Sequence, residues 1–217
     1  MDSRYLKPSK YVIFLLRKLE TLISHLPYFK FIKGTKDIDP KITFGIWFRQ
    51  RVLRINSEAY WPMHPSSLVT YPQNILIGKD TNPGYNPGCF IHGVNKIYIG
   101  NHTKIGPNVG IMSGNHNVYN LSEQTINEPI IIEEYCWIGM NSMILPGVKL
   151  GEHTIVAANS VVNKSFPDGY QILAGSPAKI VKKLDPSHCI KYTVQTNYIG
   201  YIREEDFNLF RMKKLRI

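Results

Sequence analysis

The chain has 217 residues, of which 43% are hydrophobic and 19% charged, so it can bury one folded core and is not intrinsically disordered. Its longest unbroken apolar run, Tyr11 to Leu16, has six residues, far below the roughly 18 that a membrane-spanning helix needs. Three cysteines at positions 89, 136 and 189 form neither a C-x-x-C pair nor a disulfide scaffold, which favours a reducing cytoplasm.

The net charge of +10 is unevenly distributed along the chain. Residues 1–54 carry +8 and residues 179–217 carry +5, whereas residues 55–178 carry −3. A nucleic-acid-binding domain is expected to place a basic stripe with stacking aromatics on its folded body, and no such stripe is present. We therefore expect no nucleic-acid partner, and basic ends that are solvated or that meet a phosphorylated cofactor or a membrane surface.

Residues 5–33 have the apolar spacing of an amphipathic helix, with Pro27 as a break. Basic residues such as Lys10, Arg17 and Lys18 fall off the apolar stripe. Packing on the protein's own body or on a second subunit is the favoured interpretation, and peripheral contact with the inner face of a membrane is the alternative. We assign residues 1–60 to an N-terminal helical and capping segment.

A six-residue repeat of aliphatic side chains begins after Ile75. Six consecutive members of this series keep the spacing without error, although Ile, Leu and Val make up only 55 of the 217 residues. One helical face cannot produce a period of six, and a chance run of this length is on the order of one in four thousand per register. The series comprises Ile99, Ile105 and Ile111, and then Ile132, Ile138, Ile144, Leu150, Val156 and Val162.

The residue after each aliphatic is often small, as at Gly100, Gly106, Gly139 and Gly151, so the chain can turn there. This pattern predicts an all-β fold, a parallel β-helix with three short sides per coil, over residues 61–184. The 21 residues from Ile111 to Ile132 break the period, so residues 113–128 are expected to leave the stack as a loop. Residues 185–217 form a C-terminal extension.

Several motifs follow one another along residues 75–184. In order, they are IGNHTKIGPNV from Ile99, SGNH from Ser113, CWIG from Cys136, ILPGV from Ile144 and AGSPAK from Ala174. Together they resemble the hexapeptide-repeat acyltransferases, in particular the maltose, galactoside and polysaccharide O-acetyltransferases. The resemblance implies a left-handed β-helix, a homotrimer with sites between subunits, and acetyl-CoA as the donor.

Acyl transfer from a thioester to a hydroxyl needs a base and a donor for the developing oxyanion. His116 is the expected base, because it begins the predicted loop and its Asn-His pair matches the family's catalytic position. Its orienting partner stays open among Glu123, Glu128 and a main-chain carbonyl. The resemblance assigns the oxyanion or thioester contact to the backbone N–H of Met140.

Along the cofactor, the resemblance implies main-chain contacts to the pantetheine arm and basic residues near the phosphates. The main-chain contacts are expected around Gly139, Ala157 and Ala158. The basic residues at matching positions are Lys164, Lys179 and Lys182. Solvated surface lysines are the alternative interpretation.

On the acceptor side the chain departs from the family, because the usual Asn before the Ile-Gly-Asn motif is not at its expected place. Asn86 and His92 are substitutes for it, and Trp137 is expected beside the acceptor or in a packed edge. The expected function is O-acetylation of a sugar in cell-surface polysaccharide synthesis, with no metal required. A small non-sugar acceptor, a zinc lyase of the carbonic anhydrase type and an inactive scaffold are the alternatives.

Overall fold

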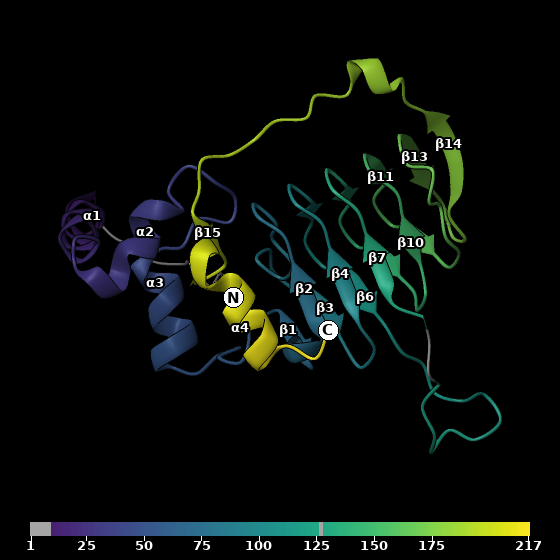
Figure 1. Ribbon diagram of the computed structural model, residues 1–217, viewed down its shortest axis with the longest axis horizontal. Coiled ribbons are helices and arrows are strands. Elements are labelled where there is room, and N and C mark those ends of the chain that lie inside the picture. Colours follow the sequence, from purple (N-terminus) through teal and green to yellow (C-terminus); the bar gives the residue numbers. More distant parts are fainter. Residues whose placement is uncertain (1–9, 126–127) are drawn as a thin grey trace, which may run out of the picture.

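A computed structural model describes residues 10–125 and 128–217, and its main body is a stack of short parallel strands in three sheets (Figure 1). Face A contains β1 (Leu68–Thr70), β3 (Phe90–His92), β6 (Gly110–Met112), β9 (Met143–Ile144) and β12 (Val161–Val162). Face B contains β2 (Ile75–Ile77), β4 (Ile97–Ile99), β7 (Ile130–Ile132) and β10 (Lys149–Leu150). Face C contains β5 (Lys104–Ile105), β8 (Trp137–Ile138), β11 (Thr154–Val156) and β13 (Gln171–Ala174), with β14 (Lys179–Lys183) antiparallel at its edge.

The chain visits faces A, B and C in turn, and each strand pairs in parallel with the equivalent strand of the next coil. This arrangement confirms the predicted parallel β-helix. We name the three edges by the faces they join. The AB corner comprises residues 71–74, 93–96, 113–125, 128–129, 145–148 and 163–166; the BC corner comprises 78–81, 100–103, 133–136, 151–153 and 167–170; the CA corner comprises 82–89, 106–109, 139–142, 157–160 and 175–178.

The repeating aliphatic side chains fill the inside of the stack. All nine members of the series have at most 3% of their surface exposed, and Ile111 stacks between Ile91 and Ile144 on face A. Burying one such side chain contributes about 1.5–3 kcal/mol relative to leaving it exposed. Since each coil covers the aliphatics of its neighbour, the stack is stabilised by contacts between adjacent coils.

The small residues after the aliphatics lie where successive coils approach most closely. A Cβ atom added at Gly100 would lie 2.6 Å from the backbone nitrogen of Glu134, and one added at Gly139 would lie 2.7 Å from that of Ala158. There is therefore no space for a side chain at these turns. Many turns also contain a non-glycine residue with positive φ, a feature that the six-residue repeat does not predict.

At the BC corner, the left-handed positions are occupied by aromatic rings that form a ladder along the stack. His102, Tyr135, His153 and Tyr170 have φ between 47° and 58°, and their consecutive ring centroids are 4.9, 4.9 and 5.2 Å apart. The stacking of these rings offsets the cost of left-handed backbone at residues with a Cβ atom.

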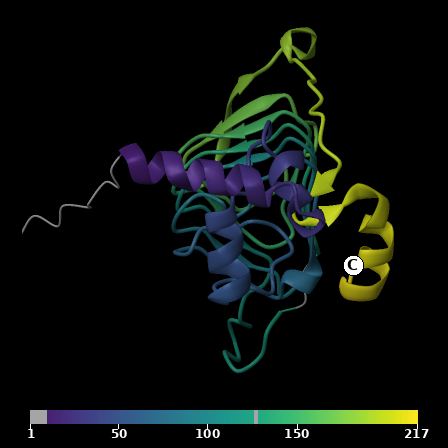
Figure 2. The same cartoon turned by 90° about the vertical axis from the view of Figure 1, so that its left-hand side faces the viewer.

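The N-terminal part lies across one end of the stack (Figure 2). It contains α1 (Lys10–Ile23), η1 (Pro27–Phe29), α2 (Lys30–Gly34), α3 (Phe44–Trp47) and the π-helix η2 (Phe48–Val52). A small second core of Phe31, Ile32 and Ile42 joins these helices to one another. Trp61 is fully buried at the end of the stack, where its indole N–H donates to Pro83 O at 2.7 Å.

The C-terminal part returns from the last coil to the first. After η4 (Pro186–His188), an extended strap, residues 189–197, leads to β15 (Tyr198–Ile199), β16 (Ile202–Arg203) and α4 (Glu204–Lys214) (Figure 1). A last short helix, η3 (Pro72–Asn74), lies between β1 and β2. None of the helices in the described ranges is long and apolar enough to cross a membrane.

Candidate active site

The segment that interrupts the repeat projects from the AB corner as a hairpin (Figure 1, lower right). Its two legs, residues 115–117 and 123–125, are antiparallel, with a bridge between His116 and Gln124. Asn117 N donates to Glu123 O and Thr125 N donates to Asn115 O, both at 2.8 Å. We call this element the His116 hairpin; its main-chain hydrogen bonds hold His116 in a defined leg rather than in an irregular loop.

Ser113 anchors the hairpin to the coil below. Its backbone N–H donates to His92 O at 2.9 Å, and its hydroxyl lies 2.8 Å from the same oxygen. The side chain of Asn95 donates to Ser113 O at 2.7 Å, and Asn95 N donates to the Ser113 hydroxyl at 2.9 Å. Ser113 itself is fully buried, so the position where the chain leaves the stack is fixed by satisfied hydrogen bonds.

The His116 side chain is exposed, and its ring makes no hydrogen bond or ion pair with another residue of the described ranges. Of the two carboxylates expected as orienting partners, Glu123 instead accepts a long 3.4 Å hydrogen bond from the side chain of Asn117. Glu128 lines a cavity beside Lys96 and Arg216. Within the described ranges, neither carboxylate forms a hydrogen bond or ion pair with the imidazole.

His92 lies one coil below the hairpin, at the end of β3. Its Nδ1 is 2.6 Å from the hydroxyl of Thr70, and its ring stacks on Phe90 with centroids 5.9 Å apart. Partial burial lowers the pKa of His92, and the electrostatic interaction with nearby His116 lowers it further. His92 therefore binds a proton less readily than a free imidazole, and its Nδ1 contacts Thr70 while Nε2 has no partner among the described contacts. Thr70 was not expected from the sequence, because its spacing to His92 falls outside the six-residue register.

Met140, Gly139, Ala157 and Ala158 come together at the CA corner. The register of face C places Met140 directly between Pro107 of the coil below and Ala158 of the coil above. The backbone N–H of Met140 donates to no acceptor in the described part of the chain, whereas its carbonyl accepts from Asn159 N at 3.0 Å. An N–H that is free and close to the surface can stabilise a developing oxyanion.

The expected base and the expected oxyanion donor therefore lie on different corners of one chain. His116 follows β6 at the AB corner, and Met140 follows β8 at the CA corner, with face A between them. A single copy does not bring them together, so a site that uses both needs a second copy of the chain.

The three lysines expected near the cofactor phosphates also separate into two groups. Lys179 and Lys182 lie on the exposed edge strand β14, where Lys179 pairs with Ala174 next to the CA corner. Lys164 lies at the AB corner with its ammonium 5.5 Å from the centre of the Phe166 ring. Of the three lysines, Lys179 is next to the last turn of the CA corner, and Lys182 is further along the same strand, paired with Ile172.

The three residues expected to contact the acceptor, Asn86, His92 and Trp137, do not lie together. Asn86 lies at the CA corner, where its side chain donates to Ile105 O at 2.6 Å and so links two coils. Trp137 points outward from face C with 56% of its surface exposed. Of the three, only His92 is near His116.

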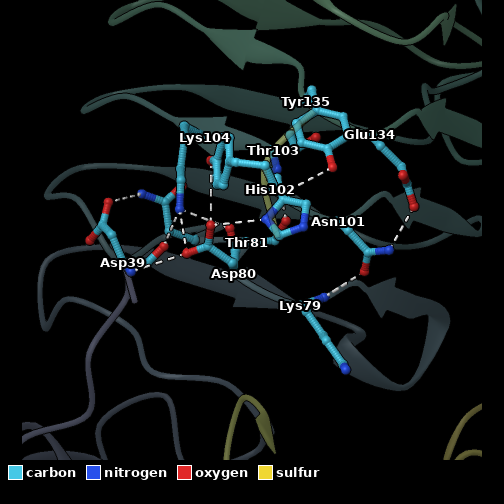
Figure 3. A network of polar contacts seen from close by, with 12 residues as sticks. Asp39, Lys79, Asp80, Thr81, Asn101, His102, Thr103, Lys104, Glu134 and Tyr135 are labelled. Atoms are coloured by element: carbon cyan, nitrogen blue, oxygen red, sulfur yellow. Dashed lines mark hydrogen bonds and ion pairs between the residues drawn. The ribbon is translucent and has the colours of Figure 1, made fainter. Parts of the chain in front are cut away.

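A buried polar network at the BC corner was missed by the sequence analysis (Figure 3). The carboxylate of Asp80, which is 5% exposed, accepts from the ammonium of Lys104 at 2.7 Å and lies 3.1 Å from Nδ1 of His102. Tyr192 of the strap adds its ring to the ladder and its hydroxyl to the same carboxylate at 3.4 Å. The charges pair internally, so this corner is structural. Within residues 10–125 and 128–217, no three His, Cys, Asp or Glu side chains gather as a metal site.

Comparison with known proteins gives one family. A family model described as bacterial transferase hexapeptide (six repeats) matches residues 129–164. The Saccharomyces cerevisiae protein YJL218W, named a candidate acetyltransferase, is 32% identical over 139 residues, which cover 63% of this chain and 67% of the relative. The galactoside O-acetyltransferase of Lactococcus lactis is 35% identical over 94 residues, so the matched segment covers 42% of this chain and less than half, 45%, of that enzyme.

Among solved structures, a hexapeptide-repeat acetyltransferase of Vibrio cholerae in complex with acetyl coenzyme A has a TM-score of 0.53. It is 25% identical to this chain, and the match covers 82% of this chain and 92% of the other. The similarity therefore extends beyond the repeats matched by the family model.

Proposed function

Because the chain belongs to the hexapeptide-repeat acyltransferases, we propose that it transfers the acetyl group of acetyl-CoA to a hydroxyl of a sugar. Its galactoside-acetylating relative supports a sugar acceptor, and cell-surface polysaccharide is the proposed destination. The feature that supports this activity most is the His116 imidazole, which is exposed, unpaired among the described contacts and held in a hydrogen-bonded hairpin leg.

In the proposed reaction, a neutral His116 takes the proton of the acceptor hydroxyl while the oxygen attacks the thioester carbon. The carbonyl oxygen becomes an oxyanion, which accepts a hydrogen bond from the free backbone N–H of Met140. Collapse of the tetrahedral species breaks the C–S bond and releases coenzyme A, whose sulfur takes the proton from His116. The chain needs no covalent intermediate, and its side chains supply only a base and positioning.

We further propose that the two corners meet between copies of a homotrimer of left-handed coils. His116 from one copy would then face Met140, Gly139 and Ala158 of the next. The donor would lie along the CA corner toward Lys179 and Lys182, whose ammonium groups suit its phosphates. Lys164 lies on the AB corner, so it would reach the donor only from the His116 side.

Two further expectations belong to this proposal: a surface contact by α1 and a cytoplasmic location. Among the described side chains of α1, Tyr11 and Phe14 are 83% and 55% exposed. The ammonium of Lys18 lies over the Phe14 ring, and this mixture of apolar and basic groups suits either a second subunit or an anionic lipid surface. A cytoplasmic location fits the reduced cysteines Cys89 and Cys136, both buried and unpaired.

The test is the His116→Ala variant, assayed by release of free thiol from acetyl-CoA with a panel of sugars. We expect transfer to fall about 10²-fold or more, because a general base contributes that much, while coenzyme A binding measured by calorimetry is retained. His188→Ala is the matched control, since His188 is also exposed but lies in η4. Equal transfer by the His116 variant and the wild-type protein would refute the assignment.

A further inference from the structure

A cavity of about 630 Å³ lies at the base of the His116 hairpin, on the AB corner. Four separate segments converge on it: the turn before β2, the turn after β3, the residues just before β7 and the C-terminal tail. Its main lining residues are Asn74, Val94, Asn95, Lys96, Glu128 and Arg216.

The cavity wall is close in the chain to both histidines, His92 and His116. A Cβ atom added at Gly114, two residues before His116, would lie 2.2 Å from a methyl group of Val94 and 3.3 Å from the side-chain nitrogen of Asn95. Val94 in turn follows His92 by two residues. A group bound in the cavity therefore lies beside the backbone that carries the expected base.

The walls of the cavity are held by main-chain contacts. The side chain of Asn74 donates to Gly93 O at 2.8 Å and to Val94 O at 3.2 Å. Arg216 N donates to Gln73 O at 2.7 Å, and the preceding Leu215 packs against the core of the stack. The C-terminal tail is thus fastened to the AB corner, and this contact brings the Arg216 guanidinium to a site that lies far from it in the sequence.

Two cations and one carboxylate line the cavity, so its lining has a net charge of +1. Lys96 and Arg216 form no ion pair with another residue in the described ranges, and Glu128 is the one carboxylate that lines the cavity with them. Two unpaired cations in one concave site favour an anion, and the planar guanidinium favours a carboxylate or a phosphate.

We propose that this cavity binds an anionic group, a carboxylate or a phosphate, of the acceptor, so that the substrate is an acidic rather than a neutral sugar. This inference rests on the proposed function. The acceptor, and not the donor, is the expected occupant because the hydroxyl must reach His116, and Val94 of the cavity wall packs against Gly114, two residues before it. The proposed donor groove runs along the other corner, toward Lys179.

The test compares three sugars that share one ring and differ only at carbon 6: D-galactose, D-galacturonic acid and D-galactose 6-phosphate. Binding to the full-length protein is measured by calorimetry, and acetyl transfer by thiol release. We expect at least one anionic sugar to bind about 10-fold or more tightly than the neutral one, since each hydrogen bond to a charged group contributes substantially. Preference for the acid or for the phosphate identifies which group the site accepts.

Lys96→Gln and Arg216→Gln should each weaken binding of the preferred anionic sugar by about 10-fold and leave that of the neutral sugar unchanged. Lys213→Gln removes an equally exposed cation from α4, outside the cavity, and serves as the control. Glu128→Gln should tighten binding of the anionic sugar, because it removes the competing carboxylate. Circular dichroism spectra that match the wild type establish that the variants fold.

Two results would overturn the inference: equal binding of neutral and anionic sugars, or loss of coenzyme A affinity rather than sugar affinity in the Lys96 and Arg216 variants. Because binding is measured directly, these results are separate from failure of the proposed function, which would show as no thiol release with any sugar. Anionic binding that depends on Lys96 and Arg216 would support the site even then.

Discussion

At the scale of single residues, the three backbone positions that follow Gly106, Gly139 and Ala157 form one column along the CA corner. Pro107, Met140 and Ala158 are in register in three successive coils. Pro107 has no backbone N–H, whereas Met140 and Ala158 do, so this turn forms with or without that group. The turn therefore does not depend on one type of side chain at this position, and we expect it to accept proline, which has no backbone N–H, in place of Met140.

Met140→Pro should therefore fold and lose activity. We expect acetyl transfer to fall about 10²–10³-fold, because one oxyanion donor is lost, whereas Met140→Ala should stay within about 2-fold of the wild type. Steady-state kinetics with acetyl-CoA and thermal melting of both variants measure these effects. Full activity of a folded proline variant would show that this N–H has no role in the reaction.

At the scale of the elements, the spacing between neighbouring coils depends on residues that have no side chain. Gly100 lies against the backbone of Glu133 and Glu134, so no flexible atom can move aside for an added methyl group. Gly45, in the short helix α3, has only a side-chain oxygen within 3.9 Å of an added Cβ. The same substitution therefore meets rigid backbone at one position and ordinary contact at the other.

Gly100→Ala should lower the free energy of unfolding by about 1–3 kcal/mol, because the two coils must separate to admit the methyl group. Gly45→Ala should leave it unchanged or raise it by up to about 1 kcal/mol, since alanine is the better helix former. Urea unfolding followed by circular dichroism compares the two. Equal midpoints for both variants would contradict this account of the coil contacts.

The elements also show how far the sequence predicts this molecule. The aliphatic period predicts the parallel strands and the inward side chains, because every coil must place an apolar side chain inside the stack at the same point. Ile111 and Ile144 are two such residues in adjacent coils. It does not predict the left-handed corners, where Tyr135 and His153 depend on stacking partners from other coils. The motif around His116 identifies a candidate base, but Thr70 and Arg216 reach the AB corner only through tertiary contacts that have no local pattern.

At the scale of the whole molecule, the expected base and the expected oxyanion donor are on different corners, so activity depends on assembly. A copy with His116→Ala still has Met140, and a copy with Met140→Pro still has His116. If each site takes one group from each of two copies, a mixture of these inactive variants contains some intact sites.

Refolding the two variants together should thus restore activity that neither has alone, to about a quarter of the wild-type level for random association in a closed ring. Thiol release measured before and after joint refolding, with each variant refolded separately as control, gives the comparison. No recovery in mixed oligomers, with their formation verified by differently tagged copies, would place both groups in one chain's site or exclude one of them.

The strap joins the last coil to the first, and its length is therefore tied to the number of coils. Tyr192 rests on the ring ladder, Lys191 is paired with Glu152, and Thr196 donates to Gly34 O at 2.9 Å, so the strap is fastened along its course. Each further coil would lengthen the body by about 4.8 Å, which takes one or two more residues of extended chain to follow. Repeat proteins can gain or lose coils freely when their two ends are not connected. Here the strap connects the last coil to the first, so a coil can be inserted only together with additional strap residues.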